Sequence, residues 1–143
     1  MLGLWFNQPG RRRDILFADE QSRVWSLDLA TRVVNVAAGH GVGAPNGTQD
    51  EARGVSLGKV QAMAVDGAGN LYLCEQPPPV RRVDAATRHV VTLATGTVHD
   101  RLNPVGVALG DANTVYIADA FGYVRRLGPD GRMDVIAGGG PGF

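Results

Sequence analysis

One pattern occurs three times along the 143 residues of this chain, over residues 13–28, 69–84 and 113–128. Each copy has a short apolar run, an acidic residue, a polar or proline-rich spacer and a second apolar run. Ile15, Leu71 and Val115 occupy equivalent places, which sets spacings of 56 and 44 residues. Repetition at such a period indicates a solenoid, a propeller or an array, and it restricts the fold more than any other feature.

The apolar runs have the character of β-strands. They are rich in Val, Ile, Leu, Tyr and Phe, and Gly, Asp, Asn or Pro bound them. Further apolar runs precede and follow each copy, so the second copy predicts strands at about 61–65, 70–75, 80–83 and 90–94. Four strands in such a unit are typical of a β-propeller blade. No long helical stripe is present, and residues 48–57 could form one helical turn at most.

The predicted organisation is a single all-β domain, residues 1–143, with blades at about 1–41, 58–97 and 103–140. A glycine-rich connection, about 39–59, separates the first two blades. Three blades do not close a ring, so two apolar blade faces would stay open to solvent. Two alternatives follow: two chains pair head to tail into a six-bladed ring, or the chain is part of a longer propeller.

The units resemble NHL repeats, in which a Pro-x-Gly strand is followed by a Gly-Asn-Leu-Tyr strand, an Arg-Arg strand and a strand ending in Ala-Gly. The resemblance covers nearly the whole chain, implies propeller blades of which six make a natural ring, and leaves the function open. This sequence departs from the pattern at Glu75, at Pro77–Pro79 and at Trp25. The matching residues are Pro104, Gly106, Val107, Ala108, Gly69, Asn70, Leu71, Tyr72, Tyr116, Ala118, Asp119, Val80–Val83, Val124–Leu127, Ala38–Gly39 and Ala137–Gly138.

An acidic residue ends the second strand of each copy: Asp19, Glu75 and Asp119. Such a set could surround an opening and bind a hard cation, which prefers carboxylate oxygens. Alternatively, each acid accepts backbone N–H bonds in the following turn, once per blade. We favour this structural role, because the position recurs within the repeat.

Two arginine pairs, Arg81–Arg82 and Arg125–Arg126, raise the question of a phosphate or RNA patch. Adjacent residues of a strand point to opposite faces of the sheet, so each pair cannot present both guanidinium groups to one surface. We therefore expect at least half of them to be buried against acids such as Asp84 or Asp134. The positions to which we assign a structural role are Asp19, Glu75, Asp119, Arg81 and Arg125.

The candidate binding residues are Arg11, Arg12, Arg13, His40 and His99. The three arginines are predicted in a hairpin turn and form the most exposed positive feature, suited to an anionic partner. His40 and His99 each follow a fourth strand, which would bring them to one face of the propeller. The spacing of His and Cys matches no zinc site, and no nucleotide-binding or hydrolase motif occurs. We therefore predict no catalytic residue, no metal and no cofactor.

Charge and composition restrict the partners. Fourteen Lys and Arg balance fourteen Asp and Glu, and only one residue is lysine, which argues against nucleic acid. No apolar stretch approaches the roughly 20 residues that span a bilayer. The single cysteine excludes an internal disulfide framework, and the sequence indicates no compartment.

The function that we expect is a non-catalytic scaffold for protein binding or assembly, acting through loops and the central face of the propeller. Its partner would be another protein or a second copy that completes the ring. One alternative is a propeller lyase or hydrolase whose metal site forms only in the closed ring. A second alternative is an RNA-binding NHL propeller.

Overall fold

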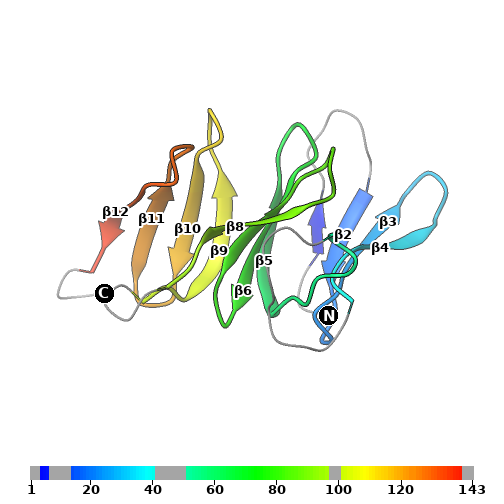
Figure 1. Cartoon of the computed structure of the whole chain (residues 1–143), viewed down its shortest axis with the longest axis horizontal. Helices are drawn as coiled ribbons and strands as arrows, with labels where there is room; N and C mark the ends of the chain where they lie inside the picture. The colour runs from blue at the N-terminus through cyan, green and yellow to red at the C-terminus, as the bar shows by residue number, and fades with distance from the viewer. Residues whose placement is uncertain (1–3, 7–13, 41–50, 97–100, 140–143) are drawn as a thin grey trace.

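The structure, a computed structural model, describes residues 4–6, 14–40, 51–96 and 101–139 (Figure 1). It consists of three four-stranded antiparallel sheets, each a meander in chain order. Blade 1 contains β1 (Leu4–Phe6), β2 (Asp14–Ala18), β3 (Val24–Asp28) and β4 (Val34–Ala38). Blade 2 contains β5 (Lys59–Val65), β6 (Leu71–Gln76), β7 (Val80–Val83) and β8 (Val90–Ala94), and blade 3 contains β9 (Pro104–Leu109), β10 (Val115–Asp119), β11 (Tyr123–Leu127) and β12 (Met133–Gly138). The prediction of all-β propeller blades is therefore confirmed.

The predicted strands of blade 2 match the observed ones closely. β7 and β8 have the predicted bounds, β5 starts two residues earlier, and β6 is shifted by one residue. The described part of residues 48–57 forms hydrogen-bonded turns and no helix, with Gly54 N–H donating to the carbonyl oxygen of Glu51. The backbone of Ala52 explains this, because it bonds to Gly39 and Arg88 of the neighbouring blades and not along its own segment. Nowhere in the described ranges does a helix reach the length and apolarity needed to cross a membrane.

Each blade has two faces that are defined by the alternation of residues along its strands. The leading face carries Leu16, Ala18 and Val24 in blade 1 and the equivalent residues in blades 2 and 3. The trailing face carries Phe17 and Leu27 in blade 1, and again their equivalents in the other blades. Directly paired residues share a face, and neighbours along a strand point to opposite faces.

Blade 2 lies in the middle and is covered on both faces (Figure 1). The leading face of blade 1 packs on the trailing face of blade 2, where Leu73 and Val83 are buried. The leading face of blade 2, with Tyr72 and Cys74, packs on the trailing face of blade 3, where Ile117 is buried. This double coverage explains why five successive residues of β6 are buried and why the strand reads as a continuous apolar run.

Glycines end the fourth strands of blades 1 and 3 for a steric reason. Gly39 and Gly138 have positive φ angles of 81° and 92°. A Cβ at these residues would lie 2.4 Å from the carbonyl oxygen of Ser22 and 1.8 Å from that of Gly122. The fourth strand thus approaches the turn between the second and third strands so closely that only glycine fits. This contact accounts for the Ala-Gly ending of the repeat.

Candidate functional site

The acid at the end of β2 organises the turn that follows it. Asp19 accepts hydrogen bonds from the backbone N–H groups of Gln21 and Arg23, at 2.9 and 3.0 Å. Its other oxygen accepts from Arg23 Nε at 2.7 Å and from Trp25 Nε1 at 2.9 Å. Burial opposes its ionisation, but the bonds from Trp25 and Arg23 outweigh burial and hold the pKa of Asp19 below its usual value.

Blade 3 repeats this arrangement with a buried ion pair. Asp119 accepts from the backbone N–H of Phe121 at 3.0 Å and from Arg125 Nε at 2.9 Å. Arg125 Nη2 also donates to the carbonyl oxygen of Arg101, in the connection that enters the blade. One guanidinium thus ties together the second strand, the third strand and the entering connection.

The acid of blade 2 uses a different donor. The residues two and four positions after Glu75 are Pro77 and Pro79, which have no N–H, whereas Asp19 bonds to those positions in blade 1. The longer side chain of Glu75 instead accepts from the backbone N–H of Gly58 at 2.7 Å. The glutamate and the proline-rich turn are therefore coupled departures from the repeat.

Arg81 is the partner of Glu75 in this buried arrangement. Its Nε lies 3.5 Å from Glu75 Oε1, and its Nη1 donates to the carbonyl oxygen of Ser56. Burial raises the pKa of Glu75 to about 7, although Arg81 and the Gly58 N–H bond favour the ionised form. Desolvation therefore dominates at this carboxyl group.

The expected acid partners of the buried arginines were wrong. Arg81 and Arg125 are buried as predicted, but each pairs with the acid that ends the second strand of its own blade. Asp84 instead accepts from the N–H groups of the turn that follows it. Asp134 pairs with the exposed Arg126, at 3.3 Å. The register explains the difference, because Asp134 lies directly opposite Arg126 on β11.

A pH-dependent prediction follows from the raised pKa of Glu75. Its stabilising contribution is complete below the unfolded-state pKa near 4.5 and is lost as the pH rises through about 7. Glu75→Gln keeps an acceptor for Gly58 N–H and removes the charge. The unfolding free energy of the variant minus that of the parent chain is expected to rise as the pH increases from about 5 to about 8, because only the parent loses this contribution. Urea denaturation across this pH range measures the difference. A difference that does not change with pH would contradict this assignment.

The predicted binding residues do not converge in the described structure. His40 is exposed, its Nε2 lies 2.8 Å from Ser56 Oγ, and its backbone N–H donates to the carbonyl oxygen of Val55. Arg11, Arg12, Arg13 and His99 lie outside the described residues. Within the described ranges no three His, Cys, Asp or Glu side chains group as metal ligands. The recurring acids, already bonded to backbone and arginine, do not fit a cation site.

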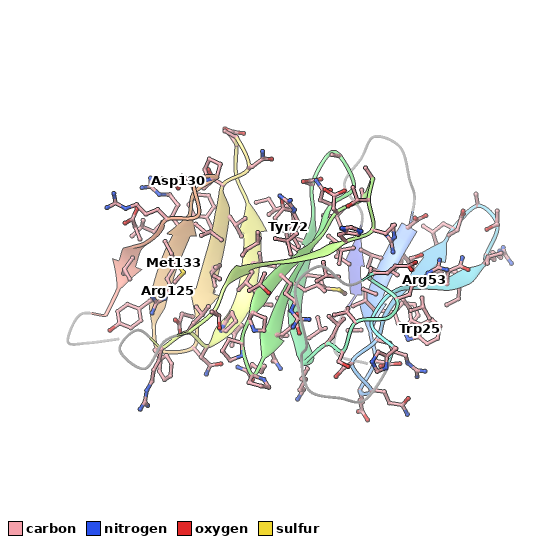
Figure 2. All side chains as sticks on the ribbon, viewed as in Figure 1. Trp25, Arg53, Tyr72, Arg125, Asp130 and Met133 are labelled. Atoms are coloured by element: carbon pink, nitrogen blue, oxygen red, sulfur yellow. The ribbon has the colours of Figure 1, made fainter. Side chains whose placement is uncertain are left out.

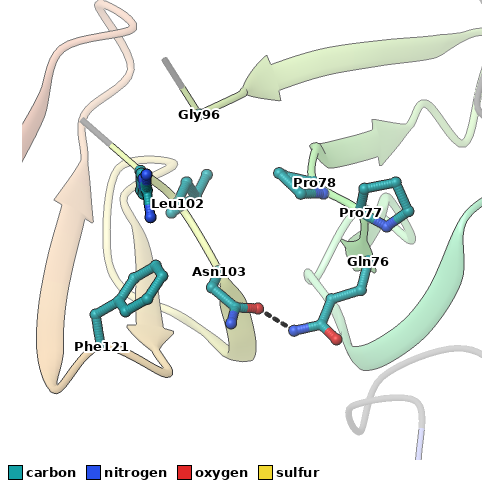
Figure 3. A pocket seen from close by; sticks show the side chains of 8 residues that line it. Gln76, Pro77, Pro78, Gly96, Leu102, Asn103 and Phe121 are labelled. Atoms are coloured by element: carbon teal, nitrogen blue, oxygen red, sulfur yellow. Dashed lines mark hydrogen bonds between the residues drawn. The ribbon is translucent and has the colours of Figure 1, made fainter. Parts of the chain in front are cut away.

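An open pocket of about 460 Å³ lies where the loops of blades 2 and 3 meet (Figure 3). Two prolines, Leu102 and Phe121 form its apolar lining, and Phe121 is 51% exposed. Its polar groups are Arg101 and the side-chain amides of Gln76 and Asn103. The Gln76 amide donates a hydrogen bond to the Asn103 amide oxygen. Among the described residues that line it there is no carboxylate or imidazole, so these residues can bind a ligand but do not themselves supply a general acid or base. Sequence reasoning missed this pocket, because its residues come from loops without a motif.

Among the described residues, the two outer faces of the blade row carry partly exposed apolar side chains, with the Arg126–Asp134 ion pair beside them on blade 3. The equivalent valines of the leading faces show this directly: Val24 and Val80 are 0% exposed, whereas Val124 of blade 3 is 38% exposed. At the other end, the trailing face of blade 1 carries a stacked pair, Phe17 and Trp25, with ring centroids 6.5 Å apart. Figure 2 shows Trp25 of blade 1 and Arg125 of blade 3 toward opposite ends of the molecule, although Arg125 itself is buried on the inner face of blade 3. We call these surfaces the leading end face and the trailing end face.

The end faces are defined by strand register. The leading end face contains Tyr116, Ala118 and Val124, which are partly or largely exposed. The trailing end face contains Ile15, Phe17, Trp25, Leu27 and Val34. The sequence predicted two open apolar faces, and the structure assigns their residues.

Comparisons with known proteins bear on the fold. No family model matches the chain, and no curated protein matches it. A solved structure, described as an X-ray structure of a proposed gluconolactonase, is similar with a TM-score of 0.58 and 17% sequence identity. The match covers 94% of this chain and 50% of the other, so this chain spans about half the length of that protein. At this identity the likeness shows the β-propeller fold alone.

Proposed function

We propose that this chain is a non-catalytic β-propeller scaffold of the NHL-repeat kind that binds protein through its end faces and loops. The exposure of Val124 carries the proposal, because the equivalent valines are fully buried wherever another blade follows. An apolar sheet face open to water is the mark of a surface that associates. The Ala-Gly strand endings and the Arg-Arg strands support the NHL-repeat assignment.

The groups that would carry other functions are engaged within the fold. Arg81 and Arg125 bond to carboxylates and carbonyl oxygens within the fold, so their guanidinium groups do not face an RNA ligand. Cys74 is buried, and burial raises its thiol pKa to about 12, so it is no nucleophile near neutral pH. A hydrolase is the second candidate, and it rests on the description of the similar structure.

The proposal is tested by making each end face polar. We expect Val124→Glu and Leu27→Glu to abolish association of the purified chain, measured by sedimentation velocity over a range of concentrations. The matched control is Leu29→Glu, because Leu29 is exposed in a turn outside both end faces and should leave association intact.

Two results would overturn the proposed function. One is a folded parent chain that stays monomeric at every concentration. The other is saturable hydrolysis of a sugar lactone by the purified chain, with or without an added divalent metal, which would favour the enzyme.

A further inference from the structure

We infer that the occupant of both end faces is a second copy of this chain, joined head to tail so that two copies close a six-bladed ring. This inference rests on the proposed function and names its partner. In such a ring the leading end face of each copy covers the trailing end face of the other, which is the arrangement that two-fold symmetry permits.

The packing within the chain provides the template for the leading end face. Tyr116, Ala118 and Val124 are equivalent to Tyr72, Cys74 and Val80 of blade 2. In blade 2 those residues are buried against the trailing face of blade 3. The leading end face thus carries the same kinds of side chain, at the same strand positions, as a surface that already packs on a trailing face.

The trailing end face matches the same template. Ile15, Phe17 and Leu27 occupy the places of Leu71, Leu73 and Val83, which are buried against the leading face of blade 1. The three apolar residues of blade 1 thus occupy positions whose equivalents in blade 2 are apolar and covered by a neighbouring blade. The two end faces of one chain are therefore complementary to each other by the rule that stacks its own blades.

Trp25 distinguishes a junction between copies from a junction within one chain. In blades 2 and 3 this position is an arginine that donates to a carbonyl oxygen of the entering connection, at Ser56 or Arg101. No connection crosses a junction between two copies, and a buried guanidinium there would lose that acceptor. Trp25 has a single donor, and Asp19 already accepts from it. Blade 1 thus carries a residue that can be buried without an entering connection.

The curvature of the blade row supports closure at two copies. The three blades follow half of a larger propeller chain with a TM-score of 0.58. A head-to-tail contact closes into a ring only when the rotation per copy divides a full turn, and otherwise it forms a filament. Because the match covers 50% of that chain, we expect three blades to turn through about half of a ring, so that a second copy returns to the first.

Tryptophan fluorescence tests the direction of the pairing. The chain has two tryptophans, so Trp5→Phe leaves Trp25 as the single reporter on the trailing end face. Val124 lies on the opposite end face, so Val124→Glu can reach Trp25 only through a second copy. We expect this substitution to remove the protection of Trp25 from acrylamide quenching. Unchanged quenching, in a parent that associates and a variant that does not, would overturn the head-to-tail pairing.

A mixing experiment gives an independent result. Val124→Glu alone and Leu27→Glu alone are each expected to be monomers, and their equimolar mixture is expected to form a dimer through the one junction left intact. A mixture that stays monomeric, or either variant dimerising alone, would overturn the pairing while leaving protein association in place. A monomeric parent chain would overturn both proposals. If circular dichroism shows that a variant is unfolded, Ala118→Glu and Ile15→Glu replace the pair on the same faces.

Discussion

Arg125→Ala is expected to lower the free energy of unfolding by about 3–5 kcal/mol, the cost of breaking a buried ion pair by removing one partner. Arg125 is 4% exposed and its Nε lies 2.9 Å from Asp119 Oδ2. The substitution leaves the carboxylate buried without its cation and the carbonyl oxygen of Arg101 without this donor. Urea denaturation at one fixed protein concentration measures the change, because association would make stability depend on concentration.

The matched control is Arg53, an exposed arginine in the turns between blades 1 and 2. Its Nε donates to the carbonyl oxygen of Val36, and it pairs with no buried carboxylate in the described structure. Arg53→Ala is expected to cost about 0.5–1.5 kcal/mol, the net contribution of one hydrogen bond. Equal costs for the two alanine variants would contradict the structural role that we assign to Arg125.

Ile117→Ala is expected to cost about 2–5 kcal/mol, because it opens a cavity where blades 2 and 3 meet. Ile117 is 0% exposed within the cluster that joins these blades. The control Leu29→Ala removes an aliphatic side chain of the same size at a turn residue outside both end faces that is 46% exposed, where the cost is expected within about 0.5 kcal/mol. Thermal or urea unfolding of both variants, at one concentration, checks the difference. A small cost at Ile117 would mean that the blades are not packed as described.

The strands could be predicted because the repeat gives each segment three examples. Leu71, Tyr72 and Leu73 are successive buried residues of a blade that is covered on both faces, so an apolar run without alternation signals this strand. The acid partners could not be predicted, because propensity and spacing do not tell which carboxylate a buried arginine reaches. The bond from Gly58 to Glu75 depends on the absence of N–H groups at two prolines, which only the folded turn makes evident.

The candidate site was predicted in outline. The count of three blades predicts two open faces. The residues on each face depend on strand register, which places Val124 directly opposite Ala118 and is known only from the structure. The pocket beside Phe121 joins a turn of one blade to a connection of the next, and no local pattern marks such a junction. The roles of the Arg11–Arg13 run and of His99 stay predictions.

The absolute mass of the purified chain, measured by light scattering on a sizing column, tests the central claim most directly. We expect one species at twice the 15.1 kDa of a single chain. Ragged, open-ended aggregates would instead favour a chain that needs further blades of a longer propeller. A well-folded monomer of 15.1 kDa would contradict the claim that the end faces bind protein.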